Sequence, residues 1–182
     1  VLQTQDHPIF KSYPEELKWL TTDDTRTTWI AQTISDIATS GNTLILVDRI
    51  SAGNLLEKKI KDSVFISGAT KTLDRKEHYD EVSTAKSKTI IATYGVASIG
   101  INIPRIFNLV LIEPGKSFVR VIQSIGRGIR KAEDKDHVQI WDITSSCKFA
   151  KRHLTTRKKF YKEANYPFTI EKIDYENPYI RR

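Results

Sequence analysis

The stretch SFVRVIQSIGRGIRK, residues 117–131, decides the fold of this chain. Within it, apolar residues recur at three- and four-residue spacing, so they share one face of a helix. These residues are Phe118, Val121, Ile122, Ile125 and Ile129. Gln123, Arg127 and Arg130 follow the same spacing and form a second stripe on roughly the opposite side. We predict one helix that Ser117 caps, that buries its apolar stripe and that holds two guanidinium groups at a surface.

Two glycines, Gly126 and Gly128, stand inside this helix, where each costs about 1 kcal/mol relative to Ala. They leave no side chain beside the two arginines, so a flat or bulky ligand can approach the backbone. A guanidinium group stays charged at any working pH, and its planar fork matches phosphate oxygens. The alternative is a solvated basic face next to Lys131. The glycines and Gln123 favour a polyphosphate site, because a solvated face needs neither.

Around this helix, apolar runs of strand length alternate with helical patterns. The run Thr43–Val47 has no polar alternation, which is typical of a parallel strand covered on both faces. Further strands are predicted at 64–66, 89–93, 107–112 and 138–143, and helices at 25–39, around 55–60, at 72–82 and at 148–163. The alternation predicts an α/β domain with a mainly parallel sheet. We predict a linker over 1–23, the domain over 24–163 and a C-terminal tail over 164–182.

The composition is that of an ordinary globular protein, with 39% hydrophobic and 28% charged residues, and the net charge of +7 favours polyanionic partners. No apolar run approaches the roughly 20 residues that cross a bilayer. A single cysteine, Cys147, and four scattered histidines predict no disulfide and no metal site, and we expect a cytoplasmic protein. The chain starts at Val1 and contains no Met, so we expect a piece of a longer protein; the alternative is that methionines are missing from the sequence as written.

Loops at the carboxyl ends of parallel strands are the usual ligand sites of such sheets. The predicted loops at 48–51, 67–70 and 93–104 all lie there, and we expect the arginine stripe to face the same mouths of the strands. The segment ATYGVASIGINIP, residues 92–104, contains small residues and two glycines that let a backbone approach phosphates. On composition alone, an ordinary turn between strand and helix explains it equally well.

The segment QSIGRGIRK resembles motif VI of superfamily 2 helicases, the Q-x-x-G-R-x-x-R element of their second RecA-like domain. The resemblance implies that Arg127 and Arg130 reach across a cleft to the γ-phosphate of ATP, one of them as an arginine finger. It also implies that Gln123 orients one of these arginines and that Gly126 lies at the ATP site.

Residues 92–104 resemble motif V of the same family. The resemblance implies contacts to the nucleic-acid backbone from Thr93 and Tyr94, and an ATP-site role for Gly100 and Asn102. DEAD-box relatives carry Asp where this chain has Asn102. We therefore expect a weaker hydrogen bond to the ribose and a distant kinship with that branch.

Two further segments resemble helicase elements that contact one nucleic-acid strand. LILVDRIS, residues 44–51, is similar to motif IV, and FISGATK, residues 65–71, to the Ser/Thr-Gly element that follows it. They imply phosphate contacts from Arg49, Ser67 and Gly68. An arginine after a strand is more often a surface salt-bridge partner, but the order and spacing relative to motifs V and VI favour the functional interpretation.

The predicted helix 148–163 is strongly basic. Its cations are Lys148, Lys151, Arg152, Arg157, Lys158, Lys159 and Lys162. We assign it a phosphate-binding surface without base specificity, with Lys151 and Lys158 as candidate contacts, and the alternative is a solvated outer helix. Nearby Tyr161, Tyr166 and Phe168 are better explained by packing than by base stacking.

The resemblance covers roughly residues 40–145 and implies a RecA-like three-layer domain, the C-terminal motor domain of an ATP-dependent DNA or RNA helicase. ATP and Mg would then be bound mainly by an N-terminal RecA-like domain of the same chain. Residues 114–117, PGKS, do not supply a P-loop here, because Val110 stands where its first glycine is needed. The fragment alone is therefore expected to be inactive.

The chain also resembles the recombination helicases of tailed phages, which implies remodelling of branched DNA and R-loops in recombination, repair and replication. The implied partners are branched DNA, single-stranded DNA or an RNA–DNA hybrid, and no membrane. Two alternatives stay open: a non-enzymatic nucleic-acid-binding module of RecA-like fold, and a translocase that moves along duplex without separating strands.

Overall fold

The structure, a computed structural model, describes residues 1–3, 7–68, 70, 74–78, 88–99, 106–115, 118–128 and 137–175, and within these ranges the side chains of 2–3 and 124–128 are not described. The strands are β1 (Leu2–Gln3), β2 (Thr43–Val47), β3 (Ser63–Ile66), β4 (Thr89–Thr93), β5 (Asn108–Ile112), β6 (Gln139–Ser145) and β7 (Lys172–Ile173). The helices are α1 (Tyr13–Thr22), α2 (Asp24–Ala38), α3 (Ile50–Lys59), α5 (Tyr94–Ser98), α6 (Phe118–Gly128) and α7 (Lys148–Glu163), with a further short helix at 74–78.

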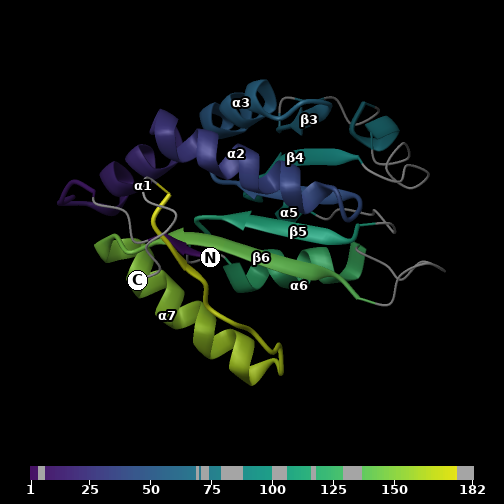
Figure 1. The fold of residues 1–182 in the computed structure, drawn as a ribbon. Helices are drawn as coiled ribbons and strands as arrows, with labels where there is room; N and C mark the ends of the chain where they lie inside the picture. The colour runs from purple at the N-terminus through teal and green to yellow at the C-terminus, as the bar shows by residue number, and fades with distance from the viewer. Residues whose placement is uncertain are drawn as a thin grey trace.

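The strands of the described residues form one sheet in the order β3-β4-β2-β5-β6-β1-β7, in which all neighbours are parallel. The predicted parallel sheet is therefore confirmed. Because neighbouring strands are parallel, each connection has to return from the carboxyl end of one strand to the amino end of the next. As a result the carboxyl ends of the strands gather at one edge, on the left of Figure 1.

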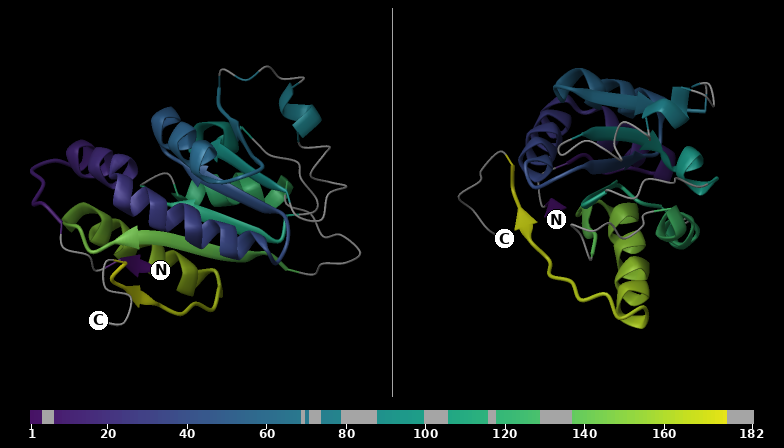
Figure 2. Two further views of the ribbon diagram at one scale, coloured as in Figure 1. Left: turned by 45° about the horizontal axis from the view of Figure 1, so that its top comes forward. Right: turned by 90° about the vertical axis from the view of Figure 1, so that its right-hand side faces the viewer.

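Helices cover both faces of this sheet (Figure 2). On one face, Ile34 of α2 and Leu56 of α3 pack in one buried cluster with Ile45 of β2. On the other face, α5, α6 and α7 pack in a second cluster, in which Val121 of α6 lies with Leu46 of β2. All five residues of β2 are buried, which explains why its sequence shows no polar alternation.

The linker predicted over 1–23 is wrong in one respect, because it contains helix α1. Ser12 caps this helix by accepting from the Glu15 amide at 3.5 Å, Pro14 stands in its first turn, and Glu15 and Glu16 place acidic groups there. These are ordinary start signals that the short apolar pattern obscured. The predicted tail likewise contains β7. The domain boundaries themselves stay a prediction.

Candidate nucleic-acid and nucleotide interface

Three neighbouring strands end at the same edge of the sheet and bring five of the predicted site residues together. Val47 of β2 is level with Thr93 of β4, and Ile66 of β3 is level with Ala92 of β4. The residues that follow these strand ends are Arg49, Ser67, Gly68, Thr93 and Tyr94. Their gathering at one edge was predicted from the sequence, and their contacts with nucleic acid stay a prediction.

Thr93 and Tyr94 open a helix rather than the loop predicted over 93–104. The Thr93 hydroxyl accepts from the Val96 amide at 3.2 Å and caps α5, which begins at the next residue. The Tyr94 hydroxyl donates to the Ile112 carbonyl at 2.9 Å, and burial raises the pKa of this phenol well above its ordinary value. Both side chains therefore position α5 against the sheet, so a contact with a phosphate would have to come from other atoms of these residues.

Ser67 and Gly68 form a tight turn at the end of β3. The Ser67 amide donates to the Thr70 hydroxyl at 3.1 Å, and the Thr70 amide donates to the Ser67 carbonyl at 3.0 Å. A Cβ built on Gly68 would meet no other atom within 4 Å. The backbone at Gly68 therefore faces open space, as a close approach to a sugar-phosphate chain requires.

Arg49 is held by two long contacts. Its Nη2 donates to the Pro14 carbonyl at 3.4 Å, and its Nε lies 3.6 Å from the Asp48 carboxylate, while 34% of the side chain stays exposed. Contacts of this length at a surface contribute about 1 kcal/mol or less. Arg49 can therefore release them for a phosphate at little cost.

Tyr13 lies beside the residues that follow β5, and the sequence analysis missed it because it fell in the predicted linker. Its ring meets the His153 ring edge-on at 4.7 Å and the Phe149 ring at 6.3 Å. A Cβ on Gly115 would stand 2.9 Å from the Tyr13 hydroxyl. Burial, and then the negative charge of Asp48, raise the pKa of Tyr13 to about 12. Helix α1 is therefore docked between the β5–α6 connection and the start of α7.

Glu16 joins α1 to α7 directly. Its buried carboxylate accepts from the Phe149 amide at 2.9 Å and from the Ala150 amide at 2.7 Å. The residue at the N-cap of α7, Cys147, makes no side-chain cap of its own. A carboxylate at this position satisfies free amides and complements the helix dipole. Glu16 thus replaces the missing cap from a helix that lies some 130 residues earlier in the chain.

Arg157 does not belong to the phosphate-binding surface, contrary to the sequence analysis. It is 2% exposed and makes a bidentate ion pair with Asp142 of β6, with its Nε at 2.7 Å and its Nη2 at 2.9 Å from the two carboxylate oxygens. Its Nη1 donates to the Pro114 carbonyl at 2.8 Å. The Tyr161 hydroxyl donates to the same carboxylate at 2.7 Å, and burial raises the pKa of Tyr161. Arg157 therefore ties α7 to β6 and to the start of the α6 segment.

A second buried ion pair stands at the end of β5. Arg26 of α2 donates to the Glu113 carboxylate and, at 2.6 Å, to the Leu20 carbonyl, while the Thr144 hydroxyl donates to Glu113 at 3.1 Å. Burial raises the pKa of Glu113, and the positive charges of Arg26 and Arg157 oppose that shift. Glu113 has a φ of 45°, which is rare for a residue with a side chain. The ion pair therefore fixes a strained corner just before the motif helix.

The motif helix α6 has the two predicted faces as far as its side chains are described. Phe118, Val121 and Ile122 are buried in the core, and Gln123 is exposed. The helix begins after the carboxyl end of β5 and precedes the parallel strand β6, so it runs back along the sheet (Figure 1). At 1.5 Å per residue, position 127 lies about 13 Å along the axis from Phe118.

The backbone of position 127 therefore lies toward the opposite edge from the mouths of the strands, and the direction in which the arginine stripe faces stays a prediction. Gly126 is in the same last turn of α6. The side chain of Arg127 is not described, and Gly100, Asn102 and Arg130 lie outside the described residues. Helix α5 also runs away from the carboxyl edge and contacts α6. Of the predicted nucleotide contacts, Gly100 and Asn102 thus follow α5 in the sequence and Gly126 and Arg127 belong to the last turn of α6. The predicted nucleic-acid contacts Thr93 and Tyr94 stand at the start of α5.

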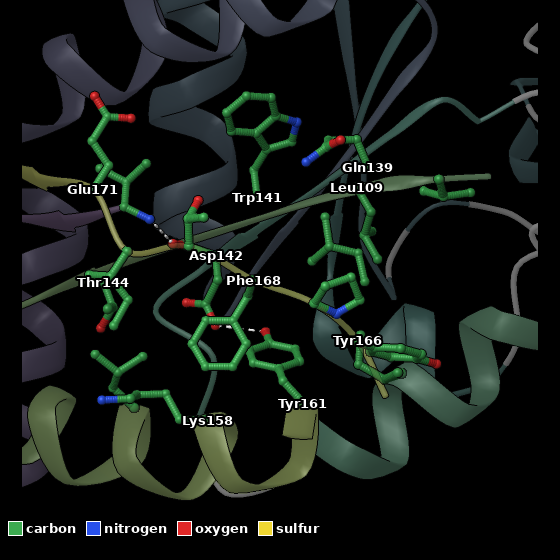
Figure 3. A pocket seen from close by; sticks show the side chains of 18 of the residues that line it. Leu109, Gln139, Trp141, Asp142, Thr144, Lys158, Tyr161, Tyr166, Phe168 and Glu171 are labelled. Atoms are coloured by element: carbon green, nitrogen blue, oxygen red, sulfur yellow. Dashed lines mark hydrogen bonds between the residues drawn. The ribbon is translucent and has the colours of Figure 1, made fainter. Parts of the chain in front are cut away.

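The two lysines assigned to α7 lie on different sides of it. Lys151 shares an exposed basic stripe with other residues of the helix, namely Lys148, Arg152, Lys159 and Lys162. Lys158 is half-buried and lines a cavity beside β6 (Figure 3). Tyr161 and Phe168 pack ring to ring at 5.7 Å, and Tyr166 packs on Phe160 at 6.2 Å, as predicted for packing residues.

The described residues contain no group of three or more His, Cys, Asp and Glu side chains that could hold a metal ion. Nor does any helix among them have the length and apolar character to span a bilayer.

The family model described as the helicase conserved C-terminal domain matches residues 25–132, more than half of the chain. This chain belongs to that family. The resemblance to the second RecA-like domain of superfamily 2 helicases is therefore confirmed.

Two viral helicases are among the relatives of this helicase domain. It is 31% identical over 161 residues to the ATP-dependent DNA helicase uvsW of Enterobacteria phage T4, a match that covers 86% of this chain and 32% of the phage protein. It is 31% identical over 104 residues to the putative helicase 22 of a Sulfolobus islandicus filamentous virus, covering 55% of this chain and 18% of that protein. The chain thus spans about a third or less of these relatives.

Solved structures confirm the RecA-like fold. The crystal structure of T4 UvsW superposes with a TM-score of 0.79 at 24% identity, covering 91% of this chain and 38% of that one. The C-terminal domain of the DEAD-box protein Dbp5 superposes with a TM-score of 0.61 at 19% identity, covering 96% of this chain and 89% of that one.

Proposed function

We propose that this helicase domain is the C-terminal motor domain of an ATP-dependent DNA helicase that remodels branched DNA and R-loops. The observation that carries the proposal is its 31% identity, over 86% of its length, to the DNA helicase of phage T4. ATP and Mg are then held mainly by an N-terminal RecA-like domain outside these 182 residues. Two points stay predictions: that the protein acts in the cytoplasm, and that it serves recombination, repair and replication.

The positions of the predicted nucleic-acid contacts and of the predicted nucleotide contacts, at opposite ends of the sheet, support the role of a motor domain. Helix α5 begins at Tyr94, with Thr93 as its cap, and both are predicted nucleic-acid contacts, whereas α6 ends in the motif that resembles an arginine-finger element. The two helices pack on each other and on the same core. When the far ends of α5 and α6 close on a nucleotide, the carboxyl ends of the strands, with the predicted nucleic-acid contacts, therefore move with them as one rigid part.

Residues of α6 fit a role beside a polyphosphate. Gln123 is exposed and stands one helical turn before position 127, so the two share a face. In this role Arg127 and Arg130 would hold negative charge on the γ-phosphate, and Gln123 would orient one guanidinium. By analogy with other NTPases, an arginine finger is worth on the order of 10³-fold or more in rate.

The first experiment is Arg130→Ala in the intact protein, with Arg120→Ala as the matched control. Arg120 is an exposed arginine of the same helix outside the motif. We expect Arg130→Ala to reduce DNA-stimulated ATPase about 10³-fold and to leave nucleotide-free DNA binding unchanged. Arg120→Ala should change neither. Unchanged ATPase with weakened DNA binding in Arg130→Ala would favour the alternative of a non-enzymatic binding module.

The substrate class needs a separate comparison. ATPase and strand displacement of the intact protein are measured on a fork, a four-way junction, an R-loop and a linear duplex of equal length. The proposal expects the branched substrates and the R-loop to be remodelled and the linear duplex to be left intact. ATP-driven movement on linear duplex without strand displacement would favour the duplex translocase.

The phosphate-binding surface is tested with Lys151→Ala, and Lys61→Ala is its control because Lys61 is exposed at the start of β3, away from the carboxyl edge. Each phosphate contact that is lost lowers the slope of log K against log salt by about 1. We expect this change for Lys151→Ala and no change for Lys61→Ala, measured by fluorescence anisotropy of a labelled fork across a salt series.

A further inference from the structure

A cavity of about 770 Å³ lies beside β6 at the margin of the sheet (Figure 3). One wall is the first half of β6, the floor is α7, and the other wall is the extended segment Tyr166–Glu171, which we call the strap. Val1 stands at its end. The lining is largely apolar, although the cavity is open to solvent on one side, and such a lining is typical of a surface that another segment covers.

The wall formed by β6 is paired on one side only. On its outer side β6 pairs with β1 at Thr144 and Ser145 among the described residues. The Gln139 amide donates to the Phe107 carbonyl on the β5 side, so by strand alternation the main-chain groups of Ile140 and Asp142 face the cavity. Among the described residues, Gln139 to Asp142 of β6 therefore pair with β5 but have no strand on the cavity side, where only the Val1 nitrogen binds the Asp142 carbonyl.

The strap has the pattern of a strand without its neighbour. Its large apolar residues alternate with smaller or polar ones, and these residues, Tyr166, Phe168 and Ile170, are 42%, 37% and 44% exposed. The strap runs directly into β7, which pairs in parallel with β1. Since β1 separates β7 from β6, the strap and β6 are set one strand apart, about 10 Å between strand axes.

The ladder at Val1 already points into this space. The Val1 nitrogen donates to the Asp142 carbonyl at 2.6 Å, and the Thr144 amide donates to the Val1 carbonyl at 3.0 Å, as a regular parallel ladder requires. If the ladder continued for two residues before Val1, the second of these residues would pair with the Ile140 carbonyl and the Asp142 amide.

We propose that the cavity is the place of a strand, and that the residues immediately before Val1 in the intact protein fill it by extending β1 along β6. This inference rests on the proposed function, because the connection from the N-terminal motor domain supplies the strand. The second residue before Val1 donates to the Ile140 carbonyl and accepts from the Asp142 amide. Four residues, about 13 Å of strand, span the exposed half of β6. The connection between the two motor domains is thereby built into the sheet, and movement of one domain pulls directly on β6.

Hydrogen exchange tests this strand. The exchange of the Ile140 and Asp142 amides is compared between residues 1–182 and the intact protein, with the Trp141 amide, which faces β5, as the internal control. We expect both amides to exchange about a hundredfold or more slowly in the intact protein, and the Trp141 amide to be protected in both. Equal exchange in the two proteins overturns the inference. If the DNA-stimulated ATPase of the intact protein is normal in that case, the proposed function still stands.

A pair of substitutions provides a second test. Ile140→Pro removes the amide that faces the cavity, and Ile140→Ala loses a similar apolar side chain but keeps that amide. We expect the difference in urea midpoint between the two variants to be larger in the intact protein than in 1–182. An equal difference in both contradicts the inference, and so does protection of Ile140 in 1–182 that rises with protein concentration, which would mean that a second copy fills the cavity.

Discussion

The ion pair between Asp142 and Arg157 offers the sharpest prediction about the stability of this domain. Asp142 accepts two hydrogen bonds from Arg157 and one from Tyr161, all between 2.7 and 2.9 Å. Burial lowers the pKa of the Arg157 guanidinium, but the charge and hydrogen bonds of Asp142, together with the charges of Glu113 and Tyr161, more than offset this and raise it. Asp142→Asn keeps the size of the side chain, removes the negative charge and turns one acceptor oxygen into an NH2 donor. Arg157 then stays buried, positively charged and without a counter-ion.

The size of the effect follows from that geometry. Removing one partner of a buried pair costs about 3–5 kcal/mol, because the remaining charge is desolvated without compensation. We expect Asp142→Asn to lower the free energy of unfolding of residues 1–182 by this amount in urea titrations followed by circular dichroism. Tyr161→Phe removes one hydrogen bond to the carboxylate and should cost about 1.5–3 kcal/mol.

The matched control is the exposed pair Lys159–Glu163 on the same helix, with 3.9 Å between the charged atoms. Glu163→Gln should cost less than about 0.5 kcal/mol. The double variant Asp142→Asn with Arg157→Met should be more stable than Asp142→Asn alone, since it removes the uncompensated charge. A loss below about 1 kcal/mol for Asp142→Asn would refute the reasoning, because the pair would then not be a desolvated one.

Three further predictions follow from local contacts. In the Gly53→Ala variant the new Cβ would clash with the Phe65 ring, so we expect a lower urea midpoint although alanine favours the helix. The control is Gly68→Ala, whose Cβ meets open space and should leave the midpoint unchanged. Thr93→Ala removes the cap of α5 and should cost about 1 kcal/mol in the same titration; no loss would mean that the cap is dispensable. Cys147 is fully buried, and burial raises its pKa to about 11. At pH 8 we therefore expect Ellman's reagent to label Cys147 at least about 10³-fold more slowly in buffer than in urea. Rapid labelling in buffer would contradict its burial.

The docking of α1 links stability to the proposed function. Glu16 caps α7, Tyr13 packs on the same helix, and α7 carries the exposed basic stripe. The orientation of that stripe relative to Arg49 and the other residues at the strand ends therefore depends on a helix that has no predicted contact with nucleic acid or nucleotide.

The sequence by itself determined the parallel sheet, its main strands and helices along the chain, and the family. Runs such as Thr43–Val47 and Thr89–Thr93 were predicted residue for residue, because a strand buried on both faces must be apolar throughout. Motif VI was visible because its apolar and polar stripes follow the helical period along one continuous segment.

The tertiary structure alone decided how these parts meet. Arg157 has the same local pattern as its basic neighbours, and only the position of Asp142 on β6 makes it a buried ion pair. The cap that Glu16 gives to α7 joins residues more than 130 positions apart. The direction of α6, which carries position 127 away from the mouths of the strands, depends on the parallel strand that follows it. Periodicity records which face of an element is buried, whereas partners that are distant in the chain are fixed by packing, which no local pattern contains.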